Sequence, residues 1–254
     1  MTLPRTPSFR LDGRRALVTG GTRGIGLGAA VALAEAGAAV TIAARTAADV
    51  TLVVDQFAEA GLAAEGVAID ITDTDAVRAF VDEVEPFQVL VNSAGTGRHS
   101  SFAEITPDGY QAVMNLNVAA TLFVSQAVVG RLRAAGLPGS IIHISSQMGH
   151  VAGPDRAVYA ASKFAVEGLS KAMAIELGPL NIRVNTVCPT FIETDLTAKN
   201  LSDPDFRAWV LSKIVLGRLG RIEDLMGPIV FLASDASALM TGSSLLVDGG
   251  WTSA

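Results

Sequence analysis

The sequence predicts a doubly wound α/β domain, in which helices cover both faces of a central parallel sheet. Three observations support this fold class. Short apolar segments of strand length alternate with longer helix-forming segments from residue 16 onward. The apolar segments are nearly continuous, as expected for strands buried on both faces. A glycine-rich turn follows the first of them, and small or polar residues follow several others.

The composition favours a globular protein and argues against several partners. Half of the 254 residues are hydrophobic and 17% are charged, so we expect a large core rather than disorder. A net charge of -6 without a basic run argues against nucleic acid or an anionic membrane as partner. The single cysteine, Cys188, excludes an internal disulfide, and no Cys/His spacing predicts a metal site.

We expect a flexible arm over residues 1–10 and one domain over residues 11–254, since α/β folds of this length often form a single domain. No linker, repeat or low-complexity segment divides the chain. The first residues lack the apolar core of a signal peptide, and the longest apolar tract is interrupted by Glu35 and Gly37. These features predict a cytoplasmic protein without a membrane span.

The first unit consists of a strand at residues 16–18, the turn TGGTRGIG at Thr19–Gly26, an alanine-rich helix that Gly37 ends, and a strand at residues 40–44. Glycines let the turn bend sharply and approach a pyrophosphate, while the helix offers unpaired N–H groups and a positive dipole end. The glycines at 20, 24 and 26 are spaced more widely than in the usual Rossmann pattern. Their place after the first strand nevertheless favours dinucleotide binding over an ordinary turn.

The end of the second strand predicts which dinucleotide is bound. An acid there would bind the ribose 2′-hydroxyl of NAD, but the sequence reads Ala44-Arg45-Thr46. Arg45 suits a 2′-phosphate, and Arg23 in the glycine turn adds a second positive charge, although either arginine is also compatible with a solvated surface position. The sequence therefore favours NADP, with NAD as the alternative.

The alternation continues along the chain. Further strands are predicted at residues 65–69, 89–91, 141–144 and 183–187, and further helices at residues 49–61, 74–84, 107–135 and 158–177. Ligands of parallel sheets bind beyond the carboxyl ends of the strands, which is where the polar segments after these strands would lie.

Tyr159 and Lys163 provide the strongest indication of chemistry. Residues four apart share one face of a helix, so the phenol and the ammonium would project together. A nearby positive charge favours the ionised phenol, which makes tyrosine a usable acid and base. The pair alone also fits a half-buried tyrosine beside a solvated lysine. The upstream serines Ser145 and Ser146 and the glycine turn favour the catalytic interpretation.

Five motifs appear together over nearly the whole chain, from Arg14 to Trp251, and resemble the short-chain dehydrogenase/reductase family. They are TGGTRGIG, NSAG at Asn92–Gly95, ISS at Ile144–Ser146, YAASK at Tyr159–Lys163 and CPTFIET at Cys188–Thr194. FIETDL and the closing DGGW are similar to segments of acyl-carrier-protein ketoreductases and of sugar, polyol and ketone reductases.

The resemblance implies four catalytic residues. Tyr159 resembles the general acid that protonates a carbonyl oxygen, and Lys163 the lysine that holds the nicotinamide ribose and promotes ionisation of the tyrosine. Ser146 resembles the serine that hydrogen-bonds the substrate oxygen, with Ser145 as a possible helper. Asn117 resembles the asparagine of a water-mediated proton path, with Asn115 as the competing choice.

The same resemblance implies a set of cofactor-binding residues. Asp70 resembles the residue beside the adenine, Asn92 one that stabilises the sheet near the cofactor, and Ile192 and Thr194 those that meet the carboxamide. The family commonly has Pro-Gly where this chain has Pro189-Thr190. The complete expected set is Gly20, Thr22, Arg23, Gly24, Ile25, Gly26, Arg45, Asp70, Ile71, Asn92, Ala94, Gly95, Tyr159, Lys163, Pro189, Ile192 and Thr194.

Residues 194–217 resemble the variable substrate lid of the family, and the resemblance also implies a homotetramer. The sequence thus predicts an oxidoreductase that transfers a hydride between NADP(H) and a small ketone or secondary alcohol, as a carbonyl reductase does. One alternative is an NAD-dependent sugar or polyol dehydrogenase. Another is a nucleotide-binding regulatory protein without turnover, which the complete Ser-Tyr-Lys set disfavours.

Overall fold

The computed structural model describes residues 2–253, apart from the side chains of Leu196 and Lys199. The predicted α/β class is confirmed: seven parallel strands form one sheet in the order β3-β2-β1-β4-β5-β6-β7. The strands are β1 (Arg15–Thr19), β2 (Ala39–Ala44), β3 (Ala64–Ala68), β4 (Val89–Asn92), β5 (Gly139–Ile144), β6 (Ile182–Pro189) and β7 (Ser244–Val247).

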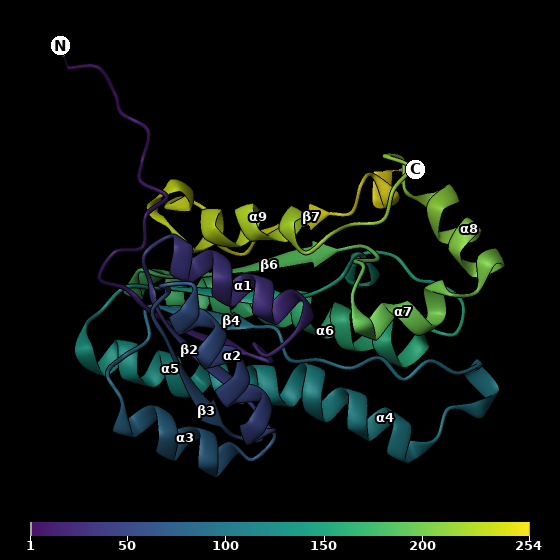
Figure 1. The fold of residues 1–254 in the computed structure, drawn as a ribbon, viewed down its shortest axis with the longest axis horizontal. Coiled ribbons are helices and arrows are strands. Elements are labelled where there is room, and N and C mark those ends of the chain that lie inside the picture. The colour runs from purple at the N-terminus through teal and green to yellow at the C-terminus, as the bar shows by residue number, and fades with distance from the viewer. Residues whose placement is uncertain (1, 254) are drawn as a thin grey trace.

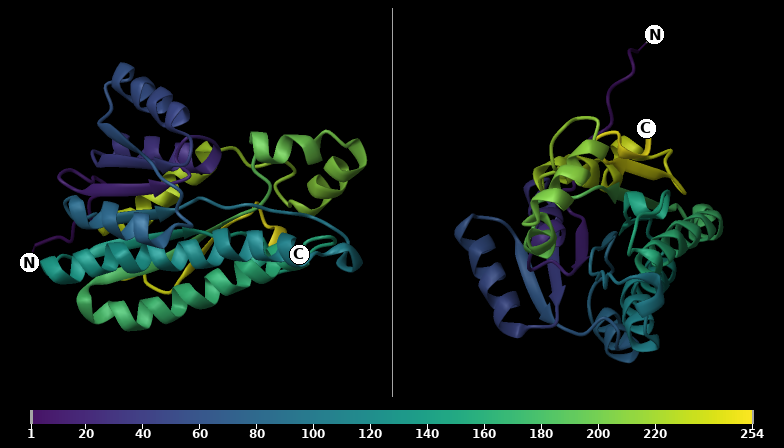
Figure 2. Two further views of the ribbon diagram at one scale, coloured as in Figure 1. Left: turned by 90° about the horizontal axis from the view of Figure 1, so that it is seen from below. Right: turned by 90° about the vertical axis from the view of Figure 1, so that its right-hand side faces the viewer.

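Helices cover both faces of this sheet (Figures 1 and 2). One apolar cluster joins α1, α2 and α9 to one face, and a second cluster joins α3, α5 and α6 to the other. The helices are α1 (Gly24–Glu35), α2 (Ala47–Glu59), α3 (Thr74–Glu83), α4 (Pro107–Met114), α5 (Thr121–Ala135), α6 (Ala157–Leu177), α7 (Asp195–Leu201), α8 (Pro204–Lys213) and α9 (Glu223–Ala233).

The helix expected over residues 107–135 is present but not regular. It consists of α4, a π-helical segment Asn115–Ala120 and α5. By length and hydropathy alone this stretch passes as a candidate membrane span. However, α5 packs against β4, β5 and α3, and its buried residues belong to the core cluster on that face of the sheet. Its apolar character is therefore explained by its place in the α/β layers.

The sequence predicted the conformation of the N-terminal segment better than the helices beyond residue 194. Residues 2–10 contain no helix or strand and are exposed, although the Phe9 ring packs 6.2 Å from that of Phe231. Residues 1 and 254, which the predicted arm and domain include, lie outside the described residues. Beyond residue 194 no separate elements were predicted. There α7 and α8 lie past the carboxyl end of β6, while α9 returns to the sheet (Figure 1).

Candidate active site

Most of the predicted motifs meet at one edge of the sheet, beyond the carboxyl ends of the parallel strands. The strand order reverses direction between β1 and β4, and such switch points leave a crevice for a ligand. A cavity of about 420 Å³ opens at this edge. It is lined by Ile25, Ser93, Gly95, Thr96, Gly97, His99, Ile144, Ser145, Ser146, Gln147, Met148, Arg156, Tyr159, Lys163, Pro189, Thr190, Phe191, Ile192, Thr194, Thr197 and Asn200.

The predicted tyrosine and lysine share one face of α6, and both line the cavity. The Lys163 ammonium lies 5.6 Å from the centroid of the Tyr159 ring. It donates a hydrogen bond of 2.9 Å to the carbonyl oxygen of Ile144 at the end of β5. Lys163 is buried and has no ion pair among the described residues, so this single backbone contact fixes its position and leaves two of its protons for a ligand.

Ser146 is the second residue after β5, and it lines the same cavity. Its hydroxyl oxygen accepts a hydrogen bond of 3.1 Å from the Met148 backbone N–H. The hydroxyl proton therefore remains available for a substrate oxygen. Ser145 also borders the cavity, but its side chain lies beside the buried Glu167 and Cys188. Of the two serines, Ser146 has the geometry for substrate binding.

Asn117 lies behind the cavity, inside the π-helical segment. Its amide forms a two-way pair with the Thr96 backbone, through bonds of 2.8 Å from the Thr96 N–H and 2.9 Å to the Thr96 carbonyl. It also donates to Ser162 on α6 at 3.0 Å. The competing residue, Asn115, is exposed, whereas Asn117 is buried. The structure therefore gives Asn117, and not Asn115, a position that links the cavity loop to the Tyr159 helix.

The glycine turn packs too closely against neighbouring backbone to admit side chains at Gly20 and Gly26. Gly20 has φ of 66°, and a side chain there would place its Cβ 2.9 Å from the Ala94 Cα. A Cβ on Gly26 would lie 2.2 Å from the Gly20 carbonyl oxygen. The following helix, α1, has no side-chain cap at Arg23 and no acidic residue in its first turn. The unpaired N–H groups at the start of α1 thus fit a pyrophosphate.

The two predicted phosphate-binding arginines lie at this edge as well. Arg45 directly follows β2 and Arg23 precedes α1, and β1 and β2 are neighbours whose carboxyl ends coincide. Both side chains are exposed, and neither has an ion pair among the described residues. Thr46, the N-cap of α2, has no side-chain capping bond, so its hydroxyl is a further candidate that the sequence interpretation missed.

The residues expected near the adenine have different surroundings. Asp70 and Ile71 follow β3, and the Asp70 carboxylate accepts bonds from the backbone and hydroxyl of Thr72. Bonds to Thr72 lower the pKa of Asp70, with a smaller effect of Arg45. Asn92 instead is buried, and its amide contacts Ser125 at 2.9 Å and His143 at 3.1 Å. Its side chain thus supports the sheet rather than reaching toward a ligand.

The loop after β6 forms the opposite wall of the cavity through Pro189, Thr190, Ile192 and Thr194. Thr190 replaces the glycine that is common in the family, and its φ is not positive, so no glycine-only conformation is required there. The Thr190 hydroxyl is buried without a hydrogen-bond partner in the described residues. A buried hydroxyl without a partner is expected to bond to a ligand or water.

A buried polar cluster beneath the cavity was not predicted. Burial raises the pKa of Glu167, but the nearby Ser145 hydroxyl and the hydrogen bonds from Ser244, Cys188 and Thr186 outweigh it and lower the pKa overall. Burial also raises the pKa of the Cys188 thiol to about 12, so the thiol stays protonated and donates a hydrogen bond of 3.3 Å to the Glu167 carboxylate. The cluster joins α6 to β6 and β7 and so fixes the helix that carries Tyr159.

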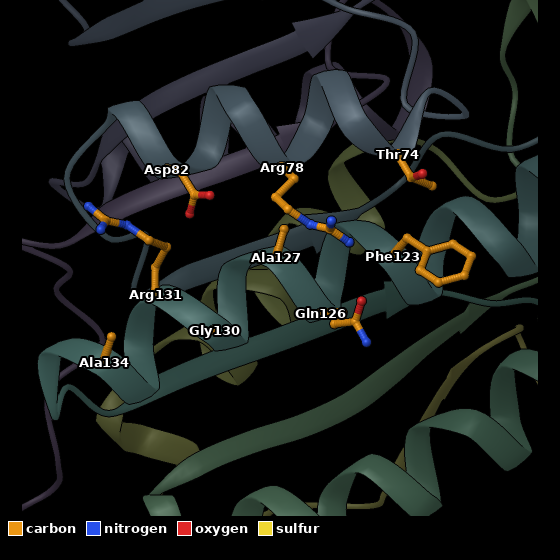
Figure 3. A pocket seen from close by; sticks show the side chains of 9 residues that line it. All are labelled: Thr74, Arg78, Asp82, Phe123, Gln126, Ala127, Gly130, Arg131 and Ala134. Atoms are coloured by element: carbon orange, nitrogen blue, oxygen red, sulfur yellow. The ribbon is translucent and has the colours of Figure 1, made fainter.

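A second hollow lies between α3 and α5, away from all the predicted motifs (Figure 3). Arg131 there donates to the Val84 carbonyl at 2.8 Å, and Arg78 and Asp82 are exposed. None of the predicted catalytic or cofactor-binding residues lines it. The cavity at the strand ends is therefore the candidate active site.

Comparison with known proteins identifies the family. A family model described as enoyl-(acyl carrier protein) reductase matches residues 20–252. D-erythrulose reductase of Gallus gallus is 45% identical over 96% of this chain and 98% of its own. L-xylulose reductase of Homo sapiens is 39% identical over 95% of this chain and 97% of its own. The crystal structure of a gluconate 5-dehydrogenase from Burkholderia cenocepacia J2315 in complex with NADP and tartrate is 40% identical, with a TM-score of 0.94 over 97% of this chain and 98% of that one.

The chain belongs to the short-chain dehydrogenase/reductase family. The resemblance inferred from its motifs is thereby confirmed, as is the enzyme class: it is an oxidoreductase of CH–OH groups that uses a nicotinamide cofactor. Its substrates are small molecules. The regulatory alternative without turnover has no support from these relatives, since those named here are reductases or dehydrogenases.

Proposed function

We propose that this protein is an NADP(H)-dependent reductase of sugar-derived ketones, with Tyr159 as the general acid. The observation that supports this most strongly is that Tyr159, Ser146 and Lys163 line one cavity beside the glycine turn. The relatives extend the argument to the substrate, since two of them are reductases of ketoses and a third was crystallised with NADP.

The residues present fit a dinucleotide. The glycine turn and the start of α1 would hold its pyrophosphate, Arg45, Arg23 and Thr46 its 2′-phosphate, and Lys163 its nicotinamide ribose. Pro189, Thr190, Ile192 and Thr194 would border the nicotinamide ring, and the unpartnered Thr190 hydroxyl would bond there. When bound, NADPH supplies the hydride for the carbonyl carbon.

Three side chains of this protein handle the carbonyl oxygen during reduction. The Ser146 hydroxyl donates a hydrogen bond to that oxygen, which orients the carbonyl toward the cofactor side of the cavity. The Tyr159 hydroxyl transfers its proton to the same oxygen as negative charge develops there, leaving a phenolate. The Lys163 ammonium stabilises the phenolate by its charge. Asn117 holds the Thr96 loop and α6 in fixed relative positions through hydrogen bonds to Thr96 and Ser162. This arrangement would allow a water path to return a proton to Tyr159.

We also propose that residues 194–217 act as a substrate lid and that the protein is a cytoplasmic homotetramer. Lid side chains Phe206 and Trp209 pack against Phe191 and Trp251 at one end of the cavity, which supports a covering role. The outer face of α6 exposes Phe164 and Ile175, and both would be buried by association of subunits. Light scattering after size exclusion measures the mass, and a monomer would exclude the assembly.

Steady-state oxidation of NADPH and NADH with a panel of ketoses, keto acids and acyl thioesters tests the proposed function. We expect turnover with NADPH and a sugar-derived ketone, and weaker turnover with NADH. A preference for NADH would overturn the cofactor assignment while leaving the reaction class intact. Turnover that survives in Tyr159→Phe would show that another group supplies the proton.

A further inference from the structure

Arg156 lines the cavity and forms no ion pair within the described residues 2–253. It occupies the position before α6, three residues ahead of Tyr159, so both side chains project from one side of the helix start. The residue is only 9% exposed, which is unusual for an arginine, and it lines the cavity. Burial lowers the pKa of its guanidinium, opposed by the nearby Tyr159 and Asp155. The side chain is thus partly desolvated while it remains charged.

No residue of the described chain neutralises this guanidinium. It forms no hydrogen bond and no ion pair there; Asp155 acts on it only from beyond ion-pair distance. Its guanidinium carbon lies 5.9 Å from the centroid of the Phe206 ring. Desolvating a charge is unfavourable unless a partner compensates it. The guanidinium is therefore available to an anionic group of a ligand in the cavity.

The rest of the cavity is positive and rich in unpaired polar groups. None of its lining residues is Asp or Glu, and burial lowers the pKa of His99 to about 4, which keeps it neutral near pH 7. The other cation, Lys163, is already fixed by the Ile144 carbonyl. Gln147 is buried, and neither its side chain nor the Thr190 hydroxyl forms a hydrogen bond with the part of the chain that the structure describes. Such groups match the hydroxyls of a polyol chain.

We infer that Arg156 binds the carboxylate of the substrate, and that the preferred substrate is a polyhydroxylated keto acid of the sugar-acid class rather than a neutral ketose. The guanidinium fork matches a carboxylate in two parallel hydrogen bonds. The spacing to Tyr159 places the carboxylate about one helical turn from the reacting carbonyl. This inference rests on the proposed function and specifies the substrate class of the same site.

The first test measures binding without turnover. Isothermal titration of the enzyme–NADPH complex with D-gluconate and with D-sorbitol compares two ligands that differ only in a carboxylate or a hydroxymethyl group at one end. We expect gluconate to bind at least about ten-fold more tightly, because a charge-assisted pair is broken in the sorbitol complex. Equal affinities, or no binding of gluconate, would overturn the inference.

Variants then assign the preference to the arginine. Arg156→Met keeps the length of the side chain but removes its charge, and it should abolish the preference for gluconate, whereas Arg156→Lys should keep part of it. Arg78→Met, the same change on the exposed side of α3 and away from the cavity, should behave as the unaltered protein. Unchanged NADPH affinity in each variant shows that the fold is intact. A gluconate affinity that Arg156→Met leaves within two-fold would contradict the assignment.

Kinetics separate this inference from the proposed function. Two matched pairs are compared with NADPH: 5-keto-D-gluconate with L-sorbose, and 2-keto-D-gluconate with D-fructose. We expect the keto acid of at least one pair to have the higher kcat/KM, and Arg156→Met to remove that advantage. Turnover that favours the neutral ketoses would overturn the inference and leave the reductase function standing. Gluconate binding that depends on Arg156, without turnover of any ketone, would support the inference and overturn the proposed reductase function.

Discussion

The two ends of the cofactor site are built differently. At the nicotinamide end, Lys163 and Asn117 are buried and held by hydrogen bonds from the protein itself. At the 2′-phosphate end, Arg45 and Arg23 are exposed and have no ion pair among the described residues. Groups that take part in a reaction need a fixed geometry before the substrate arrives, whereas flexible cations can be ordered by the phosphate they bind. Changes at the first end should therefore affect turnover and stability, and changes at the second only cofactor affinity.

The largest expected effect is that of Tyr159→Phe. The change removes only the hydroxyl, so kcat should fall by about 10²–10⁴-fold with loss of the general acid. NADPH affinity, measured by the change in its fluorescence on binding, should stay the same. Parallel losses of affinity and kcat would mean that the hydroxyl serves cofactor binding instead.

The buried His143, which contacts Asn92 beneath the nicotinamide end, should make the stability of the protein depend on pH. Burial lowers the pKa of His143 to about 4, with Glu167 opposing and Lys163 adding to the shift. The unfolded chain therefore binds a proton near pH 6.5 that the folded protein does not, so stability is complete above this pH and falls as the pH drops toward 4. The expected loss is about 3 kcal/mol.

Urea unfolding between pH 7 and 4 measures this dependence. His99, whose pKa is also lowered to about 4, adds a contribution of the same sign. His143→Gln should flatten the slope even if it lowers stability at every pH. An unchanged slope in that variant would assign the loss to other groups.

Asn117→Ala should reduce stability and turnover together. Its amide connects the Thr96 loop with α6, and leaving these buried groups unpaired costs about 1–3 kcal/mol. Asn115→Ala, two residues away and exposed, is the matched control and should change neither quantity. Thermal unfolding and kcat of the two variants decide this, and equal effects would remove the distinction between the two asparagines.

The smallest effect is expected for Arg45→Asp, at the exposed end. Affinity for NADPH should fall by about ten-fold, near the lower range for a charge-assisted bond, because solvent screens the site. NADH affinity and the unfolding free energy should hardly change. Arg78→Asp, on the exposed side of α3, controls for the overall charge. Equal losses for both cofactors would contradict a role of Arg45 at the 2′-phosphate.

Most of the elements and the glycine turn could be predicted because their determinants are local. The strands at β1, β2 and β4 are continuous apolar runs, and α1 begins at Gly24, close to where the turn placed it. The lid helices were harder, because Trp209 packs against Trp251, some 40 residues away, and Phe206 packs against Phe191, and no periodic pattern within the segment specifies these contacts. The π-helical segment around Asn117 likewise depends on contacts with the Thr96 loop and α6.

The sequence by itself determined the α/β class, the dinucleotide turn and the shared face of Tyr159 and Lys163, since spacing along the chain is enough to specify each of them. Only the tertiary structure decided the environment of the groups that have no local signature. In the sequence Arg156 is one arginine among several; in the fold it is buried, lines the cavity and has no ion-pair partner among the residues that the structure describes. Burial and the absence of a partner depend on segments far apart in the chain, so they follow from packing and not from local sequence.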